Sequence, residues 1–458
     1  MVKIAFVGAG SKGFCLTICS DILSFPALRK NVTFSLMDIN KPRLDFALKS
    51  LEQYKEDHKD KFQNIEFEAT TDQREAIKDA KYIIAAFMVG GWEAYKQDVD
   101  IPFKYSVTQN VGDTLGPGGV FRFLRSVPVY EEIIKNMREV GYNAGTANPK
   151  GLFINYTNPM VMNTWYCNKL LPDSTVGLCH GVQGTSDYLR MLVGASSEEF
   201  SFTGAGINHM FWFTELWFKD YTKKDAKWEN AYPIIWEHFK EEPEIAKAEK
   251  LRWDMMKATG YFMTESCGHL SEYLPYYRKR QDLLDKYKSG DQGFGSLRHA
   301  VDMENFTRDS KKREEIVQEA PPHLQFKSTA SHEYASNIIN AMETNVPFKF
   351  FGNVMNKKGG LITNMPADCC VEVPIFADYH GLHPQGGIEL PTVCQALCTS
   401  NTMVQKAAVE GALARDKEKI YHALLLDPNT ASVCCPEEIR SMTEEMFKAN
   451  AKWLKYFD

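Results

Sequence analysis

The sequence contains no long apolar run, no long basic run, no internal repeat and no low-complexity segment. A membrane-spanning helix needs about 20 consecutive apolar residues, and no stretch of this chain approaches that length. The apolar start breaks at Gly8, which is too early for a signal peptide and fits a first strand. Because the formal net charge is −6, binding to nucleic acid or to an anionic membrane is disfavoured. We therefore expect neither kind of partner.

Cysteine spacing that would indicate a disulfide framework is also absent. The chain has eleven cysteines, an odd number, and none of them forms a C-x-x-C pair. In a chain of 458 residues this pattern is typical of reduced thiols, including the neighbouring pairs at 369–370 and 434–435. We expect a reducing, cytoplasmic compartment.

The first forty residues do contain the pattern of a dinucleotide-binding unit. An apolar run leads into Gly-Ala-Gly-Ser-Lys-Gly at 8–13, and a second apolar run ends at Asp38. Gly8 permits a tight turn, Gly10 lets the main chain approach a pyrophosphate, and Gly13 lets the next helix pack closely on the strand. The Asp38 carboxylate would bind the adenosine ribose and repel a 2′-phosphate, so we predict NAD rather than NADP.

Strand and helix patterns alternate through the first part of the chain, as in a doubly wound parallel sheet. We expect a glycine-rich loop at 113–119 before the third of the helices. The expected strands and helices are strands 3–7, 32–38, 65–69, 82–87, 151–156 and 175–179, and helices 42–54, 72–79 and 120–140.

The pattern changes near residue 195, after which longer and possibly antiparallel strands are expected. A chain of 458 residues exceeds what one hydrophobic core usually covers. We predict an α/β protein with a Rossmann-type NAD-binding domain at 1–195 and a C-terminal α+β domain at 196–458, for substrate, metal and oligomerisation. The later elements are expected as strands 201–207 and 211–218, a helical region 228–257, an exposed segment 279–313 and helices 333–343 and 390–414.

Polar clusters follow several strand ends, where open α/β sheets bind ligands. Cys179 and His209 come from two of these clusters, and a thiolate with an imidazole can hold a borderline divalent metal. A buried cysteine and a hydrogen-bonded core histidine are the alternative interpretation. A further cluster at 264–277 holds three tyrosines, which serve packing or include a base.

The chain resembles the NAD- and metal-dependent glycosidases of glycoside hydrolase family four, and within them the α-galactosidase branch. The resemblance covers essentially the whole chain, and its motifs are long and ordered. The segments that carry it are VGAGS at 7–11, LMDI at 36–39, F-x-V-G-G at 87–91, DTLGPGG at 113–119, NYTNPM at 155–160, VGLCHGVQGT at 176–185, AGINHM at 205–210, GYFMTES at 260–266 and CCVEVP at 369–374.

The resemblance implies a lactate/malate dehydrogenase-like architecture and an unusual hydrolysis, because this family does not use the ordinary pair of carboxylates. NAD takes hydride from C3 of the sugar, and the resulting ketone acidifies the hydrogen on C2. A base removes that proton, the C1–O bond breaks, water adds, and the hydride returns. NAD and a divalent metal, Mn²⁺, are therefore the expected cofactors, and a homodimer or homotetramer is expected as in relatives.

Site residues follow from the same resemblance. Cys179 and His209 match the metal ligands, and Tyr273 aligns with the base that acts at C2. His180 stands where several α-specific members have an aspartate suited to protonating the leaving oxygen, and a histidine can act as that acid. Asp113 and Asn158 match positions that hold sugar hydroxyls, and His332 replaces a frequent arginine at a position of substrate contact.

Arginine is absent after the F-x-V-G-G stretch, where members that cleave 6-phosphoglycosides carry it. We therefore expect an unphosphorylated α-galactoside as the substrate, with an α-glucoside or an α-glycosiduronide as alternatives. A lactate/malate-type dehydrogenase and a non-catalytic NAD sensor are rival functions. Net consumption of NAD with a hydroxy acid would favour the dehydrogenase.

Overall fold

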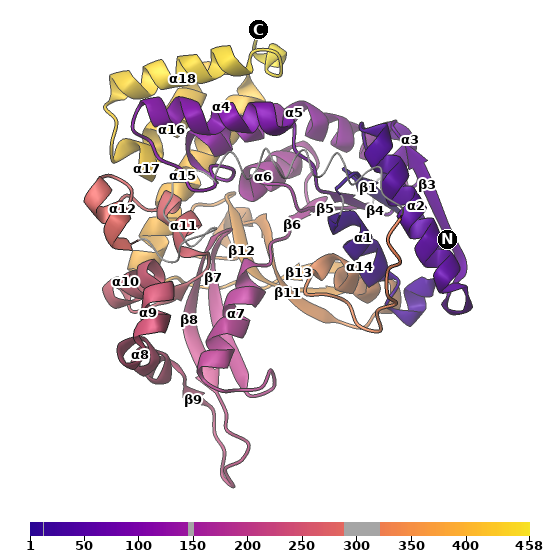
Figure 1. Cartoon of the computed structure of the whole chain (residues 1–458), viewed down its shortest axis with the longest axis horizontal. Coiled ribbons are helices and arrows are strands. Elements are labelled where there is room, and N and C mark those ends of the chain that lie inside the picture. The colour runs from indigo at the N-terminus through magenta and orange to yellow at the C-terminus, as the bar shows by residue number, and fades with distance from the viewer. Residues whose placement is uncertain (12, 145–150, 288–320) are drawn as a thin grey trace.

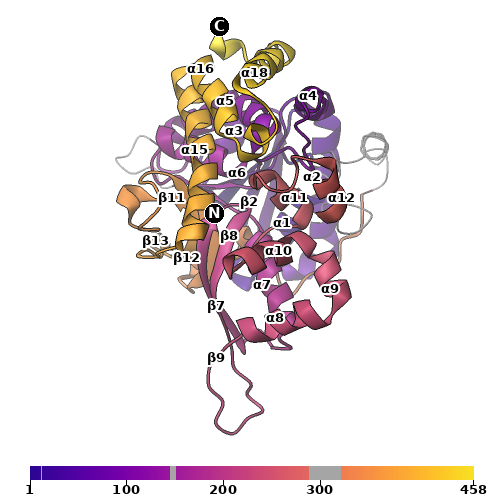
Figure 2. The same ribbon diagram turned by 90° about the vertical axis from the view of Figure 1, so that its left-hand side faces the viewer.

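The computed structural model describes residues 1–11, 13–144, 151–287 and 321–458. Thirteen strands of these ranges form one continuous sheet, and helices lie on both of its faces (Figure 1). Figure 2 shows the β7–β8 hairpin projecting as an arm away from the helices at the C-terminus. None of the helices in these ranges has the length and apolarity to cross a membrane.

Six parallel strands form the first half of the sheet, in the order 3-2-1-4-5-6 that is typical of a Rossmann fold. The strand order changes direction between β1 and β4, so the carboxyl ends of these strands open a crevice. All six predicted strands of this half are confirmed. In order across the sheet they are β3 (Gln63–Thr70), β2 (Lys30–Met37), β1 (Val2–Val7), β4 (Tyr82–Ala85), β5 (Leu152–Asn155) and β6 (Thr175–Gly177).

The sheet continues beyond β6 with antiparallel strands from residue 200 onward. The predicted hairpin of β7 and β8 is confirmed. β11 and β12 were not predicted from the sequence. β11 contains Gly352 and Asn353 and β12 contains Pro374, and these residue types normally interrupt strands. The order is β11 (Phe348–Met355), β12 (Cys370–Asp378), β7 (Phe200–Ile207), β8 (Met210–Phe218) and β10 (Phe262–Met263), with β13 (Gly381–Pro384) on β12 and β9 (Glu229–Asn230) on β8.

The helices form two layers over the sheet. One layer has α1 in contact with α2 and α14, and in the other α5 contacts α3, α4, α6 and the C-terminal helices. The helices are α1 (Phe14–Ile22), α2 (Lys41–Asp57), α3 (Gln73–Ile77), α4 (Gly91–Lys104), α5 (Gly116–Glu139), α6 (Met160–Leu170), α7 (Gly181–Leu192), α8 (Tyr232–Glu241), α9 (Pro243–Ala248), α10 (Lys250–Thr259), α11 (Cys267–Leu270), α12 (Gln281–Tyr287), α14 (Tyr334–Thr344), α15 (Thr392–Ala414), α16 (Lys417–Leu426), α17 (Pro428–Ala431) and α18 (Pro436–Asn450).

Two helix predictions were wrong in their bounds. The helix expected at 120–140 begins at Gly116, so the second half of the expected glycine-rich loop is its first turn. A Cβ atom at Gly118 would lie 2.3 Å from the carbonyl oxygen of Gly112, so glycine lets this turn start directly against the preceding loop. The region 228–257 is broken into α8, α9 and α10. Of the expected exposed segment 279–313, residues 288–313 lie outside the described residues.

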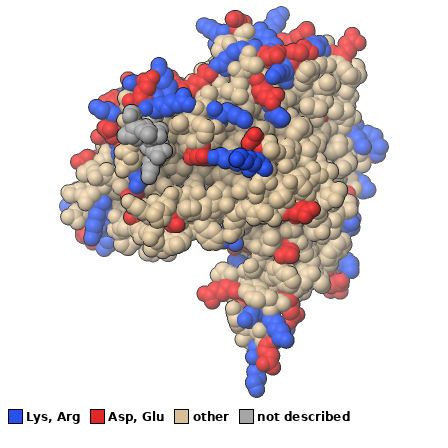
Figure 3. Space-filling view, turned by 180° about the vertical axis from the view of Figure 1, so that it is seen from behind, with Lys and Arg blue, Asp and Glu red and all other residues tan. Residues whose placement is uncertain are grey.

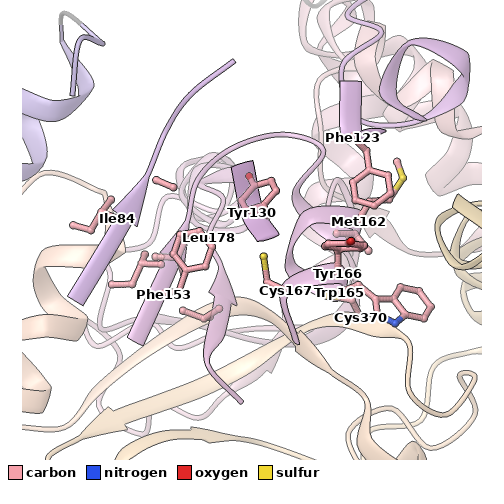
Figure 4. Packing of buried hydrophobic residues seen from close by; sticks show 14 of the residues in the cluster. Ile84, Phe123, Tyr130, Phe153, Met162, Trp165, Tyr166, Cys167, Leu178 and Cys370 are labelled. Carbon is pink, nitrogen blue, oxygen red and sulfur yellow. The ribbon is translucent and has the colours of Figure 1, made fainter. Parts of the chain in front are cut away.

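The main hydrophobic core fills the space between the parallel strands and the layer of α5 and α6 (Figure 4). Ile84 and Phe153 come from the sheet, while Tyr130 and Trp165 come from the helices, and all four are buried. The hydroxyl of Tyr130 donates to Asn155 Oδ1 at 3.0 Å, so its burial leaves no unpaired polar atom. This core fixes the strand ends that carry the candidate site.

Candidate active site

A cleft of about 1540 Å³ opens at the carboxyl ends of β1, β2, β4 and β5. Gly8, in the left-handed region with φ +92°, turns the chain there, and a Cβ atom would meet the oxygen of Ala86 at 2.2 Å. At Gly10 a Cβ atom would lie 2.6 Å from Asp38 Oδ2. The predicted glycine turn therefore exists, and it needs glycine at both positions.

Gly13 was predicted to let the next helix pack closely on the strand, and this reason was wrong. A Cβ atom there would have no other atom within 4 Å, so close packing on the strand does not require this glycine. Gly13 instead lies at the start of α1 and lines the cleft. The Asp38 carboxylate faces the same cleft, where it accepts hydrogen bonds from the amides of Gly10 and Asn40, both at 2.8 Å.

The structure brings the side chains of Cys179 and His209 together. Cys179 lies two residues beyond the end of β6. His209 lies in the two-residue turn between β7 and β8, with a left-handed φ of +65°. Cys179 Sγ and His209 Nε2 are 3.4 Å apart, and Oε2 of Glu265 lies 3.6 Å from the same nitrogen.

This donor pair fits one small divalent cation. Sulfur and nitrogen ligands bound at about 2.3 and 2.1 Å to one metal lie roughly 3.1–3.6 Å apart. Burial lowers the pKa of His209 to about 4, so its imidazole is neutral, as metal binding requires. Burial raises the pKa of Cys179, so its thiolate requires a nearby positive charge. Within the described residues no group of three or more His, Cys, Asp or Glu side chains could hold a metal, and two ligands leave coordination positions open for substrate oxygens.

Tyr273 and His269 contact the other nitrogen of His209. The hydroxyl of Tyr273 is 3.2 Å from His209 Nδ1, and His269 Nε2 is 2.9 Å from the same atom. On the far side of His269, its Nδ1 is 2.5 Å from Glu272 Oε2. Burial raises the pKa of Tyr273, and Asp113 and Glu265 add to this effect. Burial would lower the pKa of His269, but Glu272 outweighs it and raises that pKa to about 9.

Asp113 and Asn158 connect this cluster to the cofactor cleft. Asn158 lines the cleft and donates from Nδ2 to Asp113 Oδ2 at 3.0 Å. Thr114 donates to Asp113 Oδ1 at 2.6 Å and is 3.4 Å from His269 Nε2. Burial alone would raise the pKa of Asp113, but the positive charge of Arg122 leads a set of contacts that keep it below its usual value.

The two remaining predicted residues, His180 and His332, are exposed. The side chain of His180, at the start of α7, is 72% exposed, and its Nδ1 is 3.6 Å from Glu333 Oε1. His332 is exposed, and its carbonyl oxygen accepts a hydrogen bond from Gln183 at 2.9 Å. The structure therefore places His180 beside Cys179 but does not bring the His332 side chain to the cleft lining.

Sequence reasoning missed His269, Glu272 and Glu265 as members of this cluster. All three belong to the segment 264–277, where only Tyr273 was singled out. The spacing of His269 and Glu272, three residues apart in a helical turn, was a signal that could have paired them. Their contact with His209 depends on the fold and has no local signal.

Comparisons with known proteins identify the family. A sequence model described as family 4 glycosyl hydrolase matches residues 3–195, and one for the C-terminal domain of that family matches residues 204–430. An alpha-galactosidase of Rhizobium meliloti is 39% identical over 99% of this chain and 89% of its own length. An alpha-galactosidase of Bacillus subtilis is 35% identical over 99% of both chains.

Solved structures support the same fold. A 6-phospho-beta glucosidase from Thermotoga maritima, solved with manganese, NAD⁺ and glucose-6-phosphate, has a TM-score of 0.76 at 21% identity over 99% of both chains. A lactate dehydrogenase from Trichomonas vaginalis has a TM-score of 0.51 at 13% identity, covering 90% of this chain and 98% of its own. The predicted Rossmann-type, dehydrogenase-like fold is confirmed. From the match of both family models and the two full-length relatives, this chain belongs to the family 4 glycosyl hydrolases.

Proposed function

We propose that this chain hydrolyses unphosphorylated α-galactosides with NAD and a divalent cation, Mn²⁺, as cofactors. The observation that carries the proposal is the 3.4 Å separation of Cys179 Sγ and His209 Nε2. Asp113 and Asn158 connect the cluster around this pair to a cleft of dinucleotide size. Two full-length relatives named alpha-galactosidases support the sugar, and a solved relative with manganese and NAD⁺ supports the cofactors.

Each half of the site has its own task in this proposal. The glycine turn at Gly8 and Gly10 and the Asp38 carboxylate would hold the dinucleotide, while Cys179 and His209 would hold the cation. Bound NAD supplies a hydride acceptor, and a bound cation supplies positive charge that stabilises anionic oxygens.

The other side chains would bind the sugar and move protons. Tyr273 Oη, as the phenolate, would take the proton from C2 of the sugar, because it lies against His209 in the buried cluster, where a bound cation would offset the burial that raises its pKa. Asp113 would accept hydrogen bonds from sugar hydroxyls, and Asn158 would donate hydrogen bonds to them. His180 would protonate the leaving oxygen from its exposed position beside Cys179. The exposed side chain of His332 would contact only a part of the substrate that lies outside the cleft.

The described lining residues of the cleft leave little positive charge for a phosphate on the sugar, in addition to the pyrophosphate of NAD. Among the described lining residues the cations are Arg43 and Arg122, and Arg122 already contacts Asp113 at 3.9 Å and the Asn158 carbonyl at 3.2 Å. A dianionic phosphate normally needs concentrated positive charge. Figure 3 shows acidic and basic side chains interspersed over one outer face.

We also propose a cytoplasmic location and a homodimer or homotetramer. All eleven cysteines are free, and a thiol ligand needs a reducing compartment. Sedimentation equilibrium of the purified chain would measure its oligomeric state.

Activity assays test the proposed function. Nitrophenyl α-galactoside, nitrophenyl α-glucoside and their 6-phospho forms are each incubated with the chain, NAD, Mn²⁺ and a thiol reductant. We expect hydrolysis of the α-galactoside, and its loss when NAD is omitted or a chelator is added. Hydrolysis without NAD, preference for a phosphorylated substrate, or net NADH formation from a 2-hydroxy acid would overturn the proposal.

A further inference from the structure

The carboxylate of Glu272 is held by three consecutive main-chain amides. Its Oε1 accepts hydrogen bonds from the amides of Asn110 at 2.8 Å, Val111 at 3.2 Å and Gly112 at 2.9 Å. The side chain of Glu272 is only 6% exposed. Three amide donors stabilise the ionised carboxylate, which can then only accept hydrogen bonds.

This fixed acceptor determines where the neighbouring imidazole carries its hydrogen. Nδ1 of His269 is 2.5 Å from Glu272 Oε2, so Nδ1 is the donor. A cation bound to His209 Nε2 leaves the single hydrogen of that neutral imidazole on Nδ1, and its charge opposes the effect of Glu272 on the neighbouring His269. Two N–H groups cannot face each other at 2.9 Å, so with the cation bound Nε2 of His269 is the acceptor. Because this Nε2 is 2.9 Å from His209 Nδ1, it accepts the hydrogen of that nitrogen. The lone pair of His209 Nε2 is then directed to Cys179 Sγ, 3.4 Å away.

We infer that Glu272 and His269 are positioning residues, which hold His209 in the Nδ1–H tautomer and so present its Nε2 to the cation. The inference rests on the proposed function, which places the cation at Cys179 and His209. A carboxylate behind a ligating imidazole fixes its orientation and raises its basicity, and losing such a partner costs about 10–100-fold in metal affinity. Here the carboxylate acts through a second imidazole.

Paired substitutions at His269 separate this role from simple packing. His269→Gln keeps an acceptor oxygen for His209 Nδ1, whereas His269→Leu keeps bulk without an acceptor. Titrations of the metal-free variants with Mn²⁺, followed by the electron paramagnetic resonance of free Mn²⁺, give the Kd. We expect His269→Leu and Glu272→Gln to raise the Kd by about 10–100-fold, and His269→Gln to raise it clearly less.

A histidine outside the site provides the matched control. His422, in α16, is half exposed and lies 3.6 Å from Glu418, four residues earlier in the same helix. His422→Gln and His422→Leu should leave the Mn²⁺ Kd at the wild-type value. Circular dichroism and the Tm of the metal-free proteins report whether each variant folds.

A spectroscopic measurement on the wild-type chain tests the tautomers without any substitution. The chain is labelled with ¹⁵N-histidine and loaded with Zn²⁺, a diamagnetic probe of the same site. We expect ¹⁵N shifts that place one hydrogen on Nδ1 of His269 and leave its Nε2 unprotonated. A hydrogen on that Nε2 would overturn the inference, because His209 Nδ1 could not then donate to it.

The titrations also separate the inference from the proposed function. An unchanged or lower Kd in His269→Leu and Glu272→Gln, or an equal loss in His269→Gln and His269→Leu, overturns the inference alone. If the wild-type chain binds no Mn²⁺, or Cys179→Ser binds it as well as wild type, the proposed function and the inference both fail.

Discussion

At the scale of single residues, two of the twelve described non-glycine residues with a left-handed backbone lie where the candidate metal ligands meet. His209 and Glu265 have left-handed φ values of +65° and +89°, although neither is glycine. Such conformations cost about 1–3 kcal/mol each, and they cluster at functional sites. The residue types at 179 and 209 predicted a metal pair from the sequence. The strain could not be predicted, because it is imposed by the tight β7–β8 turn and the segment after β10.

Removing the phenolic oxygen of Tyr273 tests its assigned proton transfer. We expect Tyr273→Phe to lower kcat on nitrophenyl α-galactoside by about 10²–10⁴-fold, the usual contribution of a general base. The Kd for Mn²⁺ should change little, because the phenol is not a ligand. Tyr276→Phe, at a 44% exposed tyrosine in the same segment, is the control. A kcat within a few-fold of wild type in Tyr273→Phe would contradict the assignment.

The charge of Asp38 sets the cofactor preference in our account. Asp38→Asn keeps an acceptor for the Gly10 amide but removes the charge that binds the ribose hydroxyls. Loss of a charged hydrogen bond costs about 1.5–3 kcal/mol, so the Kd for NAD should rise roughly 10–150-fold. NADP should bind better relative to NAD. Fluorescence titration measures both, with Asp45→Asn, at a partly exposed position in α2, as control. Equal binding of both dinucleotides by wild-type chain would refute the assignment.

At the scale of elements, parallel strands such as β1, β4 and β5 were predictable because each contains a short buried apolar run, whereas β3 is mostly polar and has one buried residue. The start of α5 was not predictable, because Gly116 and Gly118 were interpreted as loop residues. Glycine is a poor helix former, but here the missing side chain lets the first turn of α5 approach the loop that carries Asp113. Tertiary contact therefore outweighs local propensity at this point.

A methyl group at Gly118 should disturb this contact. Gly118→Ala places a Cβ atom 2.3 Å from the Gly112 oxygen, so we expect the free energy of unfolding to fall by about 1–3 kcal/mol. Gly184→Ala is the matched control in α7, where a Cβ atom meets no atom within 4 Å and should stabilise the helix by up to about 1 kcal/mol. Thermal unfolding measures both. A Gly118→Ala chain as stable as wild type would show that the approach is not tight.

At the scale of the whole molecule, the site is assembled from both halves of the chain. Cys179 follows the last parallel strand, whereas His209 and Tyr273 come from the part of the chain after residue 195. The position of Cys179 could be predicted, because ligands bind at the carboxyl ends of parallel strands. This rule could not predict that β11 and β12, from much later in the chain, lie between β6 and β7. Because the sheet is continuous across residue 195, the division into domains at 1–195 and 196–458 stays a prediction.

The isotope content of the released sugar tests the central claim most directly. That claim is that the chain breaks the glycosidic bond after a proton leaves C2, at a site where the cofactor cleft and the Cys179–His209 pair meet. Nitrophenyl α-galactoside is hydrolysed in heavy water with NAD and Mn²⁺, and the galactose is analysed early by NMR, with free galactose incubated alongside. We predict deuterium at C2 of the released galactose. Galactose that carries no deuterium at C2 would contradict the account.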